Sequence, residues 1–214
     1  AGDILKTAIA EVKDNDAENP VYLLNLGYEV GNTTPSAGSV AIAGSARGYK
    51  KVRFLKRGED YLVQYANLDD TTFQEKTIKK NSTHNFTFLN LVTNSETSVE
   101  PEKLQWDLNF TVFTNLIEGN GSYGYSDFVV NNLKAGVKAY RVDVSSSVTY
   151  DNFNESMIDE VKFQNDQRVI GDSWRQVTSP QTIYTDRFYV LKDAENNYYK
   201  IKMTSFINAS GIRG

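Results

Sequence analysis

Cysteine is absent from this chain of 214 residues, and histidine occurs once, as His84. Without cysteine the chain cannot form disulfide bonds, thiolate nucleophiles or cysteine-based zinc sites. A single histidine also excludes metal sites that need several imidazoles. His84 can still offer one ring nitrogen to a metal, although the polar stretch from Lys80 to Asn85 favours an exposed turn.

A surplus of positive charge and a long apolar run are also missing. The formal net charge is −4, so the excess of Lys and Arg that neutralises phosphates is lacking and we expect no nucleic-acid partner. No run approaches the ~20 apolar residues that span a bilayer. No charged start and apolar signal core open the chain, so we expect Ala1 to begin a trimmed or mature segment.

Short runs rich in Val, Ile, Tyr, Phe and Thr, separated by Gly, Asn and Asp, dominate the chain from Val21 onward. This pattern predicts an all-β, antiparallel fold. Ahead of it, apolar residues at helical spacing from Asp3 to Val12 predict a short helix. Gly31–Gly48 is small, polar and Gly-rich, which predicts a long loop with one short strand at Val40–Ala43.

Two predicted hairpins resemble each other, residues 52–65 and residues 188–202. A strand that ends in Asn-Leu precedes each of them, at Val21–Leu26 and at Phe86–Leu91. A duplicated β unit is one interpretation. It places a boundary near residue 80, with an N-terminal helix and hairpin region at 1–80 and a β domain at 81–214, which can also pack as one domain.

Catalytic motifs are not supported by their context. Gly119–Gly124 matches G-x-G-x-x-G, but Tyr125–Val130 continues as a strand rather than the helix that a dinucleotide site requires. No G-x-S-x-G elbow occurs, and no spacing marks a pair of carboxylates. We expect that the protein is not an enzyme.

The segment Trp106–Phe110 resembles the Trp-Asp signature, followed by alternating apolar residues, that opens a core strand in the HmuY family. This family comprises haem-binding lipoproteins on the outer membrane of anaerobic Gram-negative bacteria. The likeness continues, in order and spacing, through Ser126–Asn132, Gly171–Arg175 and Asp186–Lys202. It covers the chain from about Phe86 to the end.

The resemblance implies an exported, cell-surface protein with a HmuY-like β domain. It would be secreted or anchored by a lipid on a cysteine upstream of Ala1. It also implies haem or a related porphyrin as cofactor, and an outer-membrane TonB-dependent haem transporter as partner. Such a protein captures haem for iron acquisition, as a hemophore does.

The same resemblance suggests where haem would be held. One axial ligand of the family falls four residues after Asp107, at Thr111, which is not a competent ligand. The other falls in the region 148–161, where Met157 is the candidate. Tyr123 and Tyr125 are candidates for the aromatic walls of a cleft, and His84 is a further candidate.

Two other classes of function remain open. One is a carbohydrate-binding domain in which aromatic side chains stack on sugar rings, for which the candidates are Tyr123, Tyr125, Trp174, Tyr198 and Tyr199. The other is a structural surface domain that has kept the fold and lost haem ligation. Thr111 favours the second of these.

Overall fold

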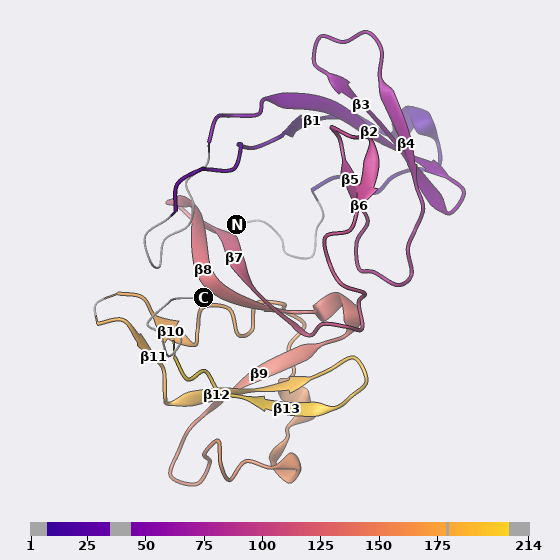
Figure 1. Cartoon of the computed structure of the whole chain (residues 1–214). Coiled ribbons are helices and arrows are strands. Elements are labelled where there is room, and N and C mark those ends of the chain that lie inside the picture. Colours follow the sequence, from indigo (N-terminus) through magenta and orange to yellow (C-terminus); the bar gives the residue numbers. More distant parts are fainter. Residues whose placement is uncertain (1–7, 35–43, 179, 206–214) are drawn as a thin grey trace. The chain divides into compact units, whose positions relative to one another are not determined.

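The computed structural model describes residues 8–34, 44–178 and 180–205 (Figure 1). As predicted, the fold is all-β, and every strand pair in the described part is antiparallel. The helical segments described are single 3-10 turns, η1 (Asp16–Glu18), η2 (Leu133–Ala135), η3 (Glu155–Met157) and η4 (Glu160–Lys162). None of them has the length and apolar content of a membrane-spanning helix.

The chain divides into two compact units, with the change between Glu102 and Lys103. The first unit is built on a four-stranded sheet in the order β1 (Val21–Asn25), β2 (Tyr49–Arg57), β3 (Asp60–Asn67) and β4 (Gln74–Ile78). A short hairpin of β5 (Phe88–Asn90) and β6 (Ser95–Thr97) belongs to the same unit. Alternation along the strands places Val52, Val63 and Tyr65 in one core cluster.

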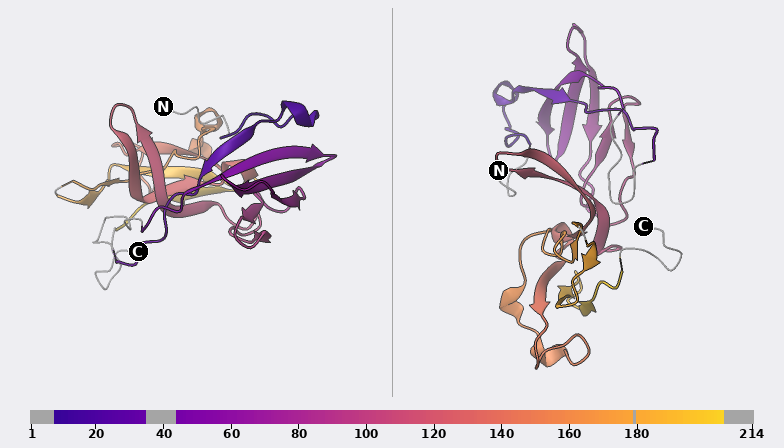
Figure 2. Two further views of the ribbon diagram at one scale, coloured as in Figure 1. Left: turned by 90° about the horizontal axis from the view of Figure 1, so that it is seen from above. Right: turned by 90° about the vertical axis from the view of Figure 1, so that its left-hand side faces the viewer.

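The second unit contains a long hairpin, a three-stranded sheet and a short strand pair. The hairpin joins β7 (Leu108–Ile117) to β8 (Gly121–Asn131) and is a curved ribbon in both views of Figure 2. The sheet has the order β13 (Tyr198–Ile201), β12 (Arg187–Lys192) and β9 (Lys138–Asp143). The strands β10 (Arg175–Gln176) and β11 (Thr182–Ile183) form the short pair.

Strand β12 organises the core of the second unit because it is the central strand of its sheet. Its residues Phe188 to Leu191 are all at most 2% exposed, so both faces of the strand are covered. One face contributes Tyr189 to a cluster with Val129, Ala139, Ile170 and Trp174. The other contributes Phe188 and Val190 to a cluster with Tyr140 and Phe153. Burial of these apolar side chains is the main stabilising contribution to the unit.

Three local predictions from the sequence have different outcomes in the structure. The expected helix at Asp3–Val12 lies partly outside the described residues, and Ala8 to Val12 are not helical. The short strand expected at Val40–Ala43 lies outside the described residues. Both expected hairpins form, as β2–β3 and β12–β13, and each pairs its first strand with an earlier strand. In the second sheet this earlier strand is β9, while β5, within the expected strand Phe86–Leu91, pairs with β6.

Candidate functional site

A β-bulge in the middle of the β7–β8 hairpin shapes the candidate site. Thr111 pairs with Phe128 and Phe113 pairs with Tyr125, so Ser126 and Asp127 together oppose Val112. Asp127 has a positive φ of 53°, which a non-glycine residue adopts only with local support. The bulge bends the strand and changes the direction of the side chains that follow it.

That support comes from the segment Gly171–Arg175. The indole Nε1 of Trp174 donates to the Asp127 carbonyl oxygen at 3.1 Å, and the Arg175 guanidinium donates to the Ser126 carbonyl oxygen. The Arg175 side chain is 3% exposed, and its Nε lies 3.9 Å from Asp127 Oδ2. Segments 126–132 and 171–175, which both carry the family resemblance, are therefore in direct contact. This contact holds the bulge in place.

Four aromatic rings gather on this hairpin, those of Phe113, Tyr123, Tyr125 and Phe128. Phe113 and Phe128 stack at 4.4 Å between ring centroids, with 14° between the ring planes. Tyr125 meets Phe128 edge-on at 5.7 Å and Tyr123 at 4.8 Å. The predicted pair Tyr123 and Tyr125 is thus brought together, and Tyr123 remains 51% exposed. Such a surface can contact a planar apolar ligand.

Thr111 belongs to the same hairpin and pairs with Phe128. Its side chain is half-buried, and its hydroxyl donates to the Val112 carbonyl oxygen at 3.3 Å. A neutral hydroxyl in a local hydrogen bond has no tendency to ligate haem iron, for which proteins use His, Met, Tyr or Cys. The position that the family resemblance assigns to one axial ligand therefore offers none here.

Met157 lies in a different part of the second unit, at the end of η3. Asn154 caps this turn, because its side chain accepts from the Ser156 backbone nitrogen. The Met157 side chain is half-buried and packs against the cluster of Tyr140, Phe153, Phe188 and Val190. Met157 is therefore not brought together with Tyr123 and Tyr125, whose rings contact each other and, through Tyr125, the ring of Phe128.

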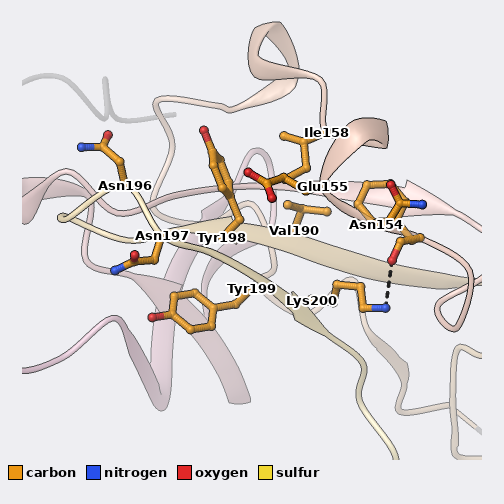
Figure 3. A pocket seen from close by; sticks show the side chains of 10 residues that line it. Asn154, Glu155, Ile158, Val190, Asn196, Asn197, Tyr198, Tyr199 and Lys200 are labelled. Atoms are coloured by element: carbon orange, nitrogen blue, oxygen red, sulfur yellow. Dashed lines mark hydrogen bonds between the residues drawn. The ribbon is translucent and has the colours of Figure 1, made fainter.

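A cavity of about 430 Å³ adjoins the segment that contains Met157 (Figure 3). Strand β12 contributes Val190 to it, and the β12–β13 turn and β13 contribute residues 196–200. The segment around η3 contributes Phe153, Asn154, Glu155 and Ile158. Lys200 Nζ donates to the carbonyl oxygens of Tyr150 at 2.7 Å and Phe153 at 2.9 Å. Tyr198 and Tyr199 are candidates from the sequence, whereas no sequence pattern indicates that Glu155 lines the same cavity.

His84 belongs to the first unit, before β5. Its Nδ1 lies 3.1 Å from Asn81 Nδ2 and 2.8 Å from Thr83 Oγ1, so local side chains already surround this nitrogen. The residue is half-buried and borders a cavity of about 170 Å³ with Phe86 and Phe88. No cluster of three or more His, Cys, Asp or Glu suited to a metal occurs within the described ranges.

Trp174 differs from its expected place on an exposed aromatic platform. It is 5% exposed and packs in the core beside Tyr189, while its indole nitrogen supports the bulge. Stacking of Trp174 on a sugar ring is therefore excluded. Tyr199 and Tyr123, at 48% and 51% exposure, retain accessible rings.

The Trp-Asp signature also has a structural role. The Asn132 side chain at the end of β8 donates to the carbonyl oxygens of Lys103 and Trp106, each at 2.9 Å, and the Asn132 backbone nitrogen donates to the Asp107 carbonyl oxygen at 2.8 Å. Burial raises the pKa of the Asp107 carboxyl, helped by the negative charges of Asp193 and Glu195. The signature thus closes the start of β7 against the end of β8.

Comparison with known proteins gives one match. The family model described as HmuY protein matches residues 82–214, which is more than half of the chain. No curated protein and no solved structure matches the chain. The matched region contains the bulged hairpin, its anchoring segment and the β9–β12–β13 sheet. The chain therefore belongs to the HmuY family, a family of haem-binding proteins.

Proposed function

We propose that this protein binds haem or a related porphyrin at the cell surface and acts in haem acquisition, as a hemophore does. Membership of the HmuY family over residues 82–214 is the observation that carries the proposal. Two aromatic groups of the second unit support it, because a macrocycle requires aromatic contact area. One is the ring cluster of Phe113, Tyr123, Tyr125 and Phe128, and the other is the group of Tyr140, Phe153 and Phe188 against which Met157 packs. The proposal includes lipid anchoring or secretion, and delivery to an outer-membrane TonB-dependent transporter.

Met157 is the proposed axial ligand of the haem iron. It is a thioether in the second unit, and Thr111 leaves the other family position without a ligand. Its present packing against Phe153 and Phe188 must loosen for the sulfur to reach iron, which the flexible, unbranched side chain permits. His84, in the first unit, is the second candidate for ligation.

Haemin titration of the full chain, followed by visible absorption in the oxidised and reduced states, tests the proposal. We expect a saturable, sharpened Soret band and a reduced spectrum typical of thioether ligation. Met157→Ala should weaken haemin binding about tenfold or more, since loss of an axial bond costs at least ~1.4 kcal/mol. Met203→Ala is the matched control, because Met203 is also half-buried and packs against the other cluster of the same unit.

Three results would change the assignment in different ways. A spectrum identical to that of free haemin would contradict haem binding altogether. Saturable binding that Met157→Ala leaves intact would remove Met157 from the site but retain the function. In that case, loss of binding on His84→Ala would move the ligand to the first unit.

A further inference from the structure

The cavity between the β12–β13 hairpin and the segment 153–158 carries chemistry that haem binding does not use (Figure 3). Its volume of about 430 Å³ is at the small end of the range of about 300–1,000 Å³ that is usual for ligand pockets. Phe153, Ile158 and Val190 supply an apolar floor, and Tyr198 supplies a ring beside Glu155. Glu155, Asn196 and Asn197 add polar groups at the rim.

Several of the surrounding side chains are fixed before any ligand arrives. The Tyr198 hydroxyl donates to a carboxylate oxygen of Glu160, which also accepts from Lys192 Nζ at 3.0 Å. The Asn197 amide nitrogen donates to Asp193 Oδ2 at 2.9 Å, which leaves the Asn197 amide oxygen as an acceptor. Lys200 is held by two carbonyl oxygens, those of Tyr150 and Phe153. A ligand would therefore meet a preorganised site, which reduces the entropic cost of binding.

Two polar side chains at this cavity have no partner within the part of the chain that the structure describes. They are the carboxylate of Glu155 and the amide of Asn196. A carboxylate offers two acceptor oxygens, and an amide offers an acceptor and two donors. Planar groups of this kind can pair with neighbouring hydroxyl groups of a polyol.

The lining has no net positive charge that would attract an anionic ligand. Its charged residues are Glu155 and Lys200, one of each sign, and the Lys200 ammonium is already hydrogen-bonded. The two propionates of a porphyrin would face the unpaired Glu155 carboxylate, and like charges at close range repel. A neutral ligand with one apolar ring face and several hydroxyl groups matches the lining better.

We propose that this cavity binds a small neutral saccharide, of one or two sugar units. The ring of Tyr198 contacts the apolar face of the sugar, formed by its C–H groups. Glu155, Asn196 and the Asn197 amide oxygen bond to its hydroxyls. A surface protein with both properties would bind haem through one site and a glycan through another.

Amide NMR of the full chain, titrated with the methyl glycosides of glucose, galactose, mannose and N-acetylglucosamine up to about 10 mM, tests this proposal at the affinities expected of a small open site. We expect saturable shifts for at least one glycoside, confined to residues 153–158 and 190–200. Glu155→Ala should weaken binding about tenfold by removal of two hydroxyl partners. Glu195→Ala is the matched control, because its exposed side chain lies in the β12–β13 turn next to Asn196 and does not line the cavity.

Two variants of Tyr198 distinguish the contribution of its ring to glycoside binding from that of its hydroxyl group. Tyr198→Phe loses the bond to Glu160 but keeps the ring, so glycoside binding should persist, whereas Tyr198→Ala should abolish it. Far-UV circular dichroism checks that each variant is folded. Absence of saturable shifts with all four glycosides, shifts outside these residues, or equal losses in the Glu155 and Glu195 variants would each overturn the proposal. A failed haemin titration alone would leave the saccharide proposal standing.

Discussion

Gly171 occupies a position where a β carbon has no room. A methyl group there would lie 2.8 Å from the Arg168 carbonyl oxygen and 3.0 Å from Phe128 Cζ, and the residue has φ +53°. Its backbone also exchanges two hydrogen bonds of 3.0 Å with Val129. Gly171→Ala should therefore destabilise the fold by about 3 kcal/mol, measured by urea unfolding.

Gly119→Ala is the control for this prediction. Gly119 has φ +78°, but an added β carbon would meet nothing within 4 Å, so the cost should be only the backbone strain of about 1 kcal/mol. An equal loss of unfolding free energy in the two variants would show that the Phe128 side chain moves aside without cost. The larger cost at Gly171 would confirm that close packing requires glycine there.

We expect the ion pair of Asp166 with Arg168 to make the stability of the second unit depend on pH. Two hydrogen bonds of 3.0 Å from the Arg168 guanidinium lower the pKa of its carboxyl, and the backbone nitrogen of Arg168 adds a third bond. Because the folded-state pKa is lowered, this contribution to stability is present above the ordinary pKa and is lost as the pH falls through the folded-state value.

Asp166→Asn should therefore destabilise the protein at pH 7, and the difference from the native chain should shrink below about pH 4. Chemical unfolding monitored at several pH values measures it. Asp172→Asn, a nearby half-buried acid, provides the comparison. A difference between native and variant that stays constant down to about pH 2 would exclude the ion pair as its source.

Only part of the candidate site can be predicted from the residue types in the sequence. The aromatic character of Tyr123 and Tyr125 predicted their participation in a ring cluster, since alternation places them on one strand face. The burial of Trp174 could not be read from the sequence, because its partner Asp127 lies far away along the chain. The packing of Met157 against the cluster around β12 depends on the tertiary fold and has no local signal in the sequence.

At the scale of elements, the β7–β8 hairpin depends on a contact from outside its own sheet. An isolated two-stranded hairpin is marginally stable in water, and its pairing is interrupted at the bulge. The guanidinium of Arg175 bonds the Ser126 carbonyl and lies beside the Asp127 carboxylate and the Trp174 ring. The hairpin should therefore lose order when Arg175 is replaced.

Arg175→Met keeps much of the side-chain volume and removes the charge. We expect a loss of about 3 kcal/mol in unfolding free energy, since it breaks a buried ion pair and leaves Asp127 without this cation. Amide hydrogen exchange should rise in β8 around residue 127 more than in β12. The double variant Asp127→Asn/Arg175→Met should recover part of the loss, and strict additivity of the two changes would argue against their coupling.

The elements themselves were largely predictable, because alternation and turn residues are local signals. Val52–Tyr65 and Phe188–Lys202 form hairpins as expected, with positive φ at Gly58 and Asn196 in their turns. The strand that pairs with the first strand of the second hairpin has no local signal in the sequence. Strand β9 takes that place, because Ala139 and Tyr140 bury against the clusters around β12, which is a property of the assembled core.

At the scale of the whole molecule, each compact unit has its own core. Val52, Val63 and Tyr65 form the cluster of the first unit, whereas the clusters around β12 belong to the second. The two tryptophans, Trp106 and Trp174, both belong to the second unit. Tryptophan fluorescence therefore reports on the second unit, while far-UV circular dichroism reports on the strands of both.

This separation predicts how core variants will behave on heating. Val63 is 6% exposed in the first unit. Val63→Ala should lower the temperature of part of the circular dichroism transition and leave the temperature of the fluorescence transition unchanged. Val129→Ala, at a fully buried side chain in the second unit, should shift the fluorescence transition. Each change should cost about 2 kcal/mol in its own unit, since it removes two buried carbon atoms and leaves a cavity.

The same thermal unfolding experiment, repeated with haemin, shows which unit binds the ligand. A ligand raises the stability of the unit that binds it, by an amount that grows with its concentration relative to Kd. If Met157 holds the iron, haemin should raise the transition of the second unit and leave that of the first, even in the Val63→Ala background. If haemin instead raised the first transition alone, the site would belong to His84 and its neighbours. If both probes moved together in every variant, the two units would unfold as one cooperative structure, and neither could be treated as an independent binding domain.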